Sequence, residues 1–127
     1  MKAYGAQSMV EPLRRVLVRR PDAAFGGADP ARWHYTSQPD LEAARIEHDA
    51  LTATLREAGC EVLYHEAPLP DHADAIFTHD PAIVTDAGAV ILRMGKAGRR
   101  GEEAAIAATL EALGVPILAT LDGAATA

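Results

Sequence analysis

A nine-residue pattern occurs twice in this chain, at positions 55–63 and 110–118. The two copies, LREAGCEVL and LEALGVPIL, align without a gap at an offset of 55 positions. In each copy a helical pattern ends at a glycine, Gly59 or Gly114, and runs directly into residues typical of a strand. Such a unit exposes an apolar face when it stands alone. The repeat therefore predicts modules that stack or pack around an axis.

Hydrophobic periodicity predicts further elements around this repeat. Apolar residues at steps of three and four predict helices over residues 41–58 and 102–113. Short apolar runs predict strands at residues 13–19, 61–65, 82–85, 89–93 and 115–119. A three-residue turn, Asp86, Ala87 and Gly88, separates the third strand from the fourth, so we expect these two strands to pair as a hairpin. The predicted fold class is α/β.

Residues 21–39 form the longest stretch without a periodic pattern. They contain Gly26, Gly27, Pro30 and Pro39, together with Trp33 and Tyr35. The stretch is too long for an ordinary connection, which favours a functional loop or flap. A surface loop held in place by one aromatic side chain is the alternative interpretation.

Composition excludes several classes of partner. The formal net charge of −6 at pH 7 argues against a nucleic-acid backbone, because phosphate contacts need a clustered basic surface. The apolar runs of the chain, such as residues 89–92, are far shorter than the roughly 20 residues that a membrane helix needs. A secretory signal requires an apolar stretch soon after the N-terminus, and this sequence has none there. The single cysteine, Cys60, fits a reducing compartment. We therefore expect one cytoplasmic domain.

Histidines and carboxylates gather between positions 65 and 80. Three interpretations are open: a site for a flat guanidinium cation, a metal site, or a solvated loop. His65, His72 and His79 are seven positions apart, which matches none of the compact metal motifs. Asp74 and Asp80 flank an apolar segment that should draw them toward a buried or half-buried site, and buried carboxylates need partners. This favours a guanidinium ligand or a structural arginine.

Two motifs in this region, DAIFTHDPAIV at positions 74–84 and RMGKAGRRGE at positions 93–102, resemble a known family. They are similar to the N-terminal half of the guanidino-group-modifying superfamily, which includes dimethylarginine dimethylaminohydrolases, arginine deiminases and amidinotransferases. The resemblance implies the pentein fold, an α/β propeller of five ββαβ modules around a pseudo-fivefold axis. The repeat would then account for about two modules. We expect residues 1–127 to be a truncated N-terminal portion of such a domain.

The same resemblance implies roles for individual residues. The aspartates matching Asp74 and Asp80 hold the substrate guanidinium, the arginine matching Arg99 grips the amino-acid carboxylate, and Phe77 would line the guanidinium channel. His79, the fifth predicted substrate-binding residue, stands where dimethylarginine hydrolases commonly carry a glutamate. The substrate is therefore open among arginine, methylated arginine and other amidines. In the plainer alternative Asp74 caps a turn, Asp80 starts one, and Arg99 belongs to a solvated arginine pair.

The superfamily attacks the guanidinium carbon with a C-terminal cysteine assisted by a histidine, and neither matching region occurs in these 127 residues. Cys60 stands at the start of a strand, which is typical of a core residue with an unreactive thiol. We therefore predict the N-terminal portion of a hydrolase that acts on C–N bonds of arginine or N-methylated arginine and gives citrulline. The resemblance implies no catalytic residue in this chain, and it implies no metal or organic cofactor.

Two alternatives to this function stay open: an amidinotransferase, and a non-catalytic module that binds guanidinium or assembles with itself. An incomplete propeller leaves strand edges and apolar surface in water. The expected partners are therefore a small guanidino substrate and a second copy of the chain covering the open edge.

Overall fold

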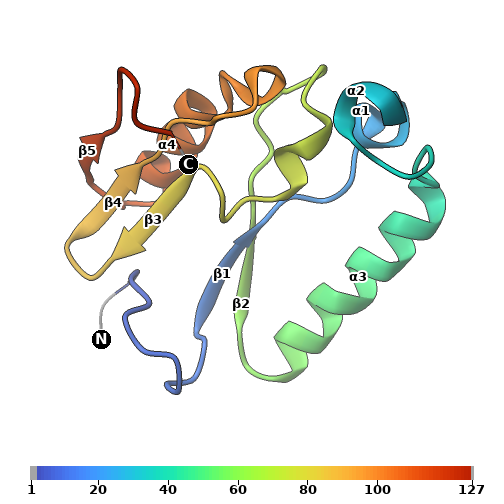
Figure 1. Ribbon diagram of the computed structural model, residues 1–127. Helices are drawn as coiled ribbons and strands as arrows, with labels where there is room; N and C mark the ends of the chain where they lie inside the picture. Colours follow the sequence, from blue (N-terminus) through green and yellow to red (C-terminus); the bar gives the residue numbers. More distant parts are fainter. Residues whose placement is uncertain (1–2, 127) are drawn as a thin grey trace.

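The computed structural model describes residues 3–126, in which strands and helices form two groups side by side (Figure 1). The strands are β1 Arg15–Val18, β2 Glu61–Tyr64, β3 Ala82–Thr85, β4 Gly88–Ile91 and β5 Ile117–Thr120. The helices are α1 Ala23–Gly26, α2 Pro30–Trp33, α3 Leu41–Glu57 and α4 Glu102–Ala112, with the 3-10 turns η1 Ala73–Ile76 and η2 Ala97–Arg99. Within residues 3–126 no helix combines the length and apolar character needed to cross a membrane.

Both copies of the sequence repeat end their helices in the same way. Gly59 follows the end of α3 with φ +89°, and Gly114 follows the end of α4 with φ +83°. The amide after each glycine donates to the carbonyl five residues earlier, at 2.9 Å in both copies. This is the hydrogen-bond pattern of a helix closed by a left-handed glycine. The two predicted helices and the strands that follow them are confirmed.

The strands form two separate sheets. β1 and β2 are parallel and are connected through α3, while β3, β4 and β5 form a three-stranded sheet in which β5 runs parallel to β4. The predicted hairpin is confirmed, but its three-residue turn is wrong, because Gly88 pairs with Thr85 and only Asp86 and Ala87 make the turn. The second module has the expected ββαβ order, whereas the first is β1–α3–β2, one strand short.

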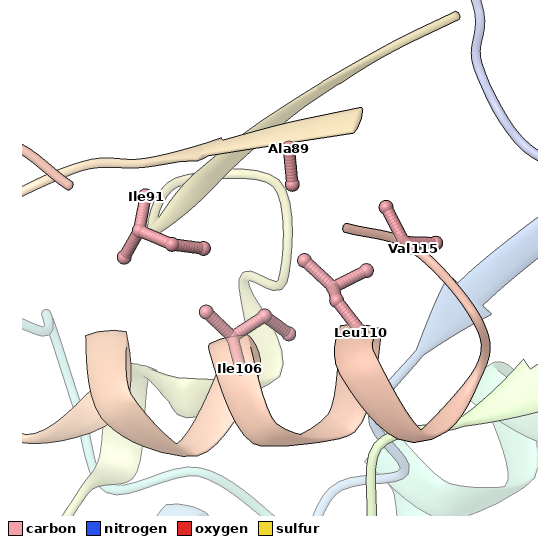
Figure 2. Close-up of a cluster of buried hydrophobic side chains, with 5 residues drawn as sticks. All are labelled: Ala89, Ile91, Ile106, Leu110 and Val115. Carbon is pink, nitrogen blue, oxygen red and sulfur yellow. The ribbon is translucent and has the colours of Figure 1, made fainter. Parts of the chain in front are cut away.

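The main core lies between α4 and the β3–β4–β5 sheet. Ile106 and Leu110 of α4 meet Ala89 and Ile91 of β4, and Val115 closes the cluster where the chain leaves the helix (Figure 2). Each of these five residues is at most 5% exposed. This packing holds α4 against the β3–β4–β5 sheet.

Residues 21–39 differ from the expected irregular loop. They contain two one-turn helices, α1 and α2, in which Asp22 and Asp29 accept hydrogen bonds from backbone amides of the first turns. Asp side chains at this position satisfy amides that the helix leaves free. Trp33, at the end of α2, is buried with Ala28 and Ala73 in a second small cluster against which Tyr35 packs. The aromatic anchor of this stretch is therefore Trp33, and it attaches the segment to η1.

Candidate functional site

The candidate site begins at η1, which lies beside α1 and α2 (Figure 1). Ala73 and Ala75 of this turn are 1% and 4% exposed, and Asp74 between them is 6% exposed. The prediction that an apolar segment draws Asp74 into the protein is confirmed. Phe77, the aromatic residue of this segment, is 42% exposed.

Two donors hold the buried carboxylate of Asp74. The hydroxyl of Tyr35 donates to Oδ1 at 2.5 Å, and Nζ of Lys96 donates to Oδ2 at 2.6 Å. Burial and the hydrogen bond to Asp74 raise the pKa of Tyr35. The ammonium of Lys96 also donates to the carbonyl of Trp33 at 3.0 Å and lies 4.8 Å from the centre of its ring. Asp74 thus joins three segments that are far apart in the sequence.

Asp80 belongs to a second group of charges, centred on Arg99. Nη1 of Arg99 donates to Oδ2 of Asp80 at 2.6 Å, and Nε and Nη2 donate to Glu102, which is 2% exposed. Burial lowers the pKa of Arg99, but its hydrogen bonds to Glu102 and Asp80 outweigh this and raise the pKa overall. The alternative of a solvated arginine pair is wrong for Arg99, because its side chain is only 7% exposed.

The other predicted residues connect these two groups. His79 is on the surface, with Nε2 3.0 Å from Oδ1 of Asp80. The amide of Phe77 donates to the carbonyl of Asp74, and the carbonyl of Phe77 accepts from the amide of Asp80 and from Nη2 of Arg99. The structure therefore brings together Asp74, Phe77, His79, Asp80 and Arg99, with the ring of Phe77 and the imidazole of His79 at the surface.

Three participants were missed from the sequence as site residues: Tyr35, Lys96 and Glu102. Tyr35 contacts Asp74 across 39 positions and Lys96 across 22. No local spacing signals such pairs. Glu102 had a signal, because its position three residues after Arg99, at the start of a helix, favours an ion pair on one face.

His65 and His72 contact separate groups of the protein. Nδ1 of His65 is 2.7 Å from the hydroxyl of Thr109, and burial together with the charge of Arg19 lowers the pKa of His65 to about 4. Nδ1 of His72 is 3.5 Å from Glu102. Within residues 3–126 no three histidine, cysteine or acidic side chains group so as to hold a metal ion.

A comparison with family models shows which family the chain belongs to. The model described as N,N dimethylarginine dimethylhydrolase, eukaryotic, matches residues 29–125. The chain belongs to this family. An arginine deiminase from Clostridium perfringens is 40% identical over 82 residues, which are 62% of this chain and 19% of that protein.

Solved structures of the dimethylarginine dimethylaminohydrolase type share the fold. The enzyme from Pseudomonas aeruginosa, solved with citrulline, aligns with a TM-score of 0.73 at 22% identity, covering 88% of this chain and 43% of that one. A dimethylarginine dimethylaminohydrolase adduct with S-methyl-L-thiocitrulline aligns with a TM-score of 0.72 at 23% identity, covering 90% and 44%. The chain therefore spans less than half the length of these relatives.

Proposed function

We propose that this chain is the guanidinium-binding portion of a hydrolase that acts on C–N bonds of arginine or N-methylated arginine and gives citrulline. Membership of the family supports the reaction class. The observation that carries the proposal is the partly open carboxylate of Asp80. Its side chain is 33% exposed, whereas those of Asp74, Arg99 and Glu102 are buried. Arg99 and the surface residue His79 each contact one of its two oxygens.

The charge balance of this network favours a cationic ligand. It contains the carboxylates of Asp74, Asp80 and Glu102 and the cations of Lys96 and Arg99. With His72 and His79 counted as neutral, one negative charge is left over. A guanidinium at Asp80 would neutralise it, and its planar fork of donors matches a carboxylate.

In this proposal the residues of the chain orient the substrate and stabilise charge. Arg99, held by Glu102, fixes the carboxylate of Asp80 so that the bound guanidinium carbon lies in one position for attack. The contact between Arg99 and the substrate carboxylate stays a prediction. Cys60 is buried and its thiol lies against the carbonyl of Glu61, so we place the nucleophile on a segment other than residues 3–126.

Binding of L-arginine to the purified chain tests the proposal. We expect calorimetry to detect binding, and Asp80→Asn to weaken it by about tenfold or more, because the neutral amide loses the charge-assisted hydrogen bonds. Asp71→Asn is the matched control, since Asp71 is an exposed aspartate of the same region. Equal binding by the wild type and Asp80→Asn would contradict the proposal.

The burial of Cys60 also fits a second candidate function, a module that binds guanidinium without catalysis. One measurement distinguishes the hydrolase portion from the binding module. A binding module forms no citrulline when further family segments are supplied, whereas the hydrolase portion does, and Asp80→Ala then removes most of the turnover.

A further inference from the structure

An apolar pocket of about 130 Å³ is lined by residues of both sheets and of α4. Val16 of β1 and Leu63 of β2 come from the first sheet, and Val84 of β3 comes from the second. Leu110 of α4 also lines the pocket. Among residues 3–126, the members of the charge network around Arg99 are not part of this lining. The pocket is therefore separate from the proposed guanidinium site.

The wall of the pocket is apolar because it is the edge of the main core. Leu110 and Val115 are members of that core and are each 5% exposed, and Tyr4, Leu17 and Val84 pack against it. All five residues line the pocket. A water molecule inside a protein needs two to four polar partners, which aliphatic side chains do not offer. The pocket therefore favours an apolar occupant.

The charged member of the lining, Arg15, already has partners in the protein. Its Nε lies 2.7 Å from Oε2 of Glu61, and its Nη1 donates to the carbonyl of Ala3 at 2.5 Å. A charged ligand would lose its hydration in the pocket and find the charge of Arg15 already compensated, which is unfavourable. The lining therefore favours an uncharged ligand.

Residues 3–7, here called the strap, lie beside the start of β1 and the β3–β4 hairpin (Figure 1). The first four of them line the pocket. Besides the bond to the carbonyl of Ala3, the amide of Asp86 donates to Oε1 of Gln7 at 2.7 Å. The strap approaches the hairpin turn closely, since a Cβ added at Gly5 would lie 2.9 Å from Cα of Asp86. Both hydrogen bonds are exposed to solvent, so the strap should open at a lower free energy than the core beneath it.

We propose that this pocket binds a small uncharged apolar ring, of the size of benzene, and that the strap is its lid. An apolar cavity of about 150 Å³ holds benzene, and this pocket has nearly that volume. Tyr4 places an aromatic side chain in the lining, and a pair of aromatic rings contributes stabilisation beyond the burial of their area. A ring held here would contact both sheets and stabilise their packing. The inference does not depend on the proposed function.

Urea unfolding at rising benzene concentration tests the binding. Because benzene would bind the folded chain alone, the unfolding equilibrium constant should fall about tenfold when benzene is at ten times its dissociation constant. Methyl NMR of the folded chain locates the ring. We expect the resonances of Val16, Leu63 and Leu110 to shift, and those of Ile83 and Leu118, which are exposed on the β3–β4–β5 sheet, to stay unchanged.

Leu113→Phe tests the pocket itself, because Leu113 lines it and the larger side chain should fill part of its volume. We expect benzene to bind about tenfold more weakly or less. Leu51→Phe adds the same group at an exposed position of α3 and should leave the affinity unchanged. If circular dichroism shows that Leu113→Phe does not fold, Val84→Phe serves as the filling variant, because Val84 lines the same pocket.

Gly5→Val tests the lid. The added side chain must push the strap away from Asp86, so benzene should exchange with the pocket on the order of tenfold faster, as measured by NMR line shapes. Gly123→Val is the matched control: both glycines have positive φ, but a Cβ at Gly123 meets nothing within 4 Å. The control should exchange benzene at the wild-type rate.

Three outcomes would overturn the inference. If benzene changes neither the unfolding nor the methyl spectrum of the wild type, the pocket is not a binding site. Shifts confined to Ile83 and Leu118 would place benzene on the exposed sheet face instead. Wild-type exchange in Gly5→Val would show that the strap is not a lid. Calorimetry with L-arginine is read separately, so failure of this inference leaves the proposed function standing, and the reverse.

Discussion

Single residues of the site differ in how far the sequence predicts them. The burial of Asp74 could be predicted, because its own neighbours are small and apolar, which is local information. The cation that contacts Asp74 could not be predicted, because Lys96 lies 22 positions away in the sequence. The sequence motif contains Lys96 but gives no indication of its partner. Pairing in space, rather than position in a motif, distinguishes the roles of the two aspartates.

The imidazole of His65 should make stability depend on pH. Burial first, and the charge of Arg19 second, lower its pKa from 6.5 to about 4 in the folded chain. Between these values the unfolded chain binds a proton that the folded chain does not, so stability falls as the pH is lowered. We expect a loss of about 2 kcal/mol from His65 between pH 6.5 and 4.5.

Urea unfolding at the two pH values measures this loss. His65→Gln should remove its share of the pH dependence, because glutamine keeps a polar group near Thr109 without titrating. His79→Gln is the control, since the side chain of His79 is 83% exposed. If the stability of His65→Gln depended on pH as strongly as that of the wild type, groups other than His65 would cause the dependence.

Elements with a long periodic pattern were predictable, and single turns were not. α3 and α4 repeat the helical step over several turns and end at glycines, so their type and ends follow from local chemistry. α1 and α2 have four residues each, too few for any period. Asp22, Asp29 and Pro30 are typical of helix starts, but a helix of one turn has no period that distinguishes it from a loop.

The two helix-ending glycines should have matched energetic roles. A Cβ added at Gly59 or Gly114 meets nothing within 4 Å, so a substitution there costs only the backbone strain of positive φ. We expect Gly59→Ala and Gly114→Ala each to lower the free energy of unfolding by about 1 kcal/mol. Asparagine tolerates this conformation, so Gly59→Asn should lose less. Chemical denaturation measures both, and equal losses for alanine and asparagine would contradict this explanation.

At the scale of the whole molecule, the family and a mixed α/β fold are established, and the propeller is not. The mixed α/β fold and the likeness to dimethylarginine dimethylaminohydrolase structures agree with the sequence prediction. Closure into a fivefold propeller, truncation and cytoplasmic location stay predictions. They depend on chain or cellular context outside residues 3–126, for which local patterns contain no information.

Self-association is the prediction that belongs to this scale. Ile83 and Leu118 are 54% and 51% exposed, while Ala89 and Ile91 of the same sheet pack against α4. An apolar sheet face in water favours contact with a second copy of the chain. We expect sedimentation to show concentration-dependent association, reduced by Ile83→Thr with Leu118→Thr. Ile46→Thr with Leu51→Thr on α3 is the control, and a monomer at every concentration would contradict the prediction.

The burial of the one cysteine at the junction of α3 and β2 has a consequence for kinetics. Cys60 is 5% exposed in the first module, which contains one of the two separate sheets. A thiol reagent reaches Cys60 only when that junction opens, so the rate at which the thiol is labelled reports local unfolding of the first module. The emission of Trp33 reports on α2 and the charge beside it. The chain therefore carries two native probes, by which the opening of a module and the rearrangement of the site can be timed separately.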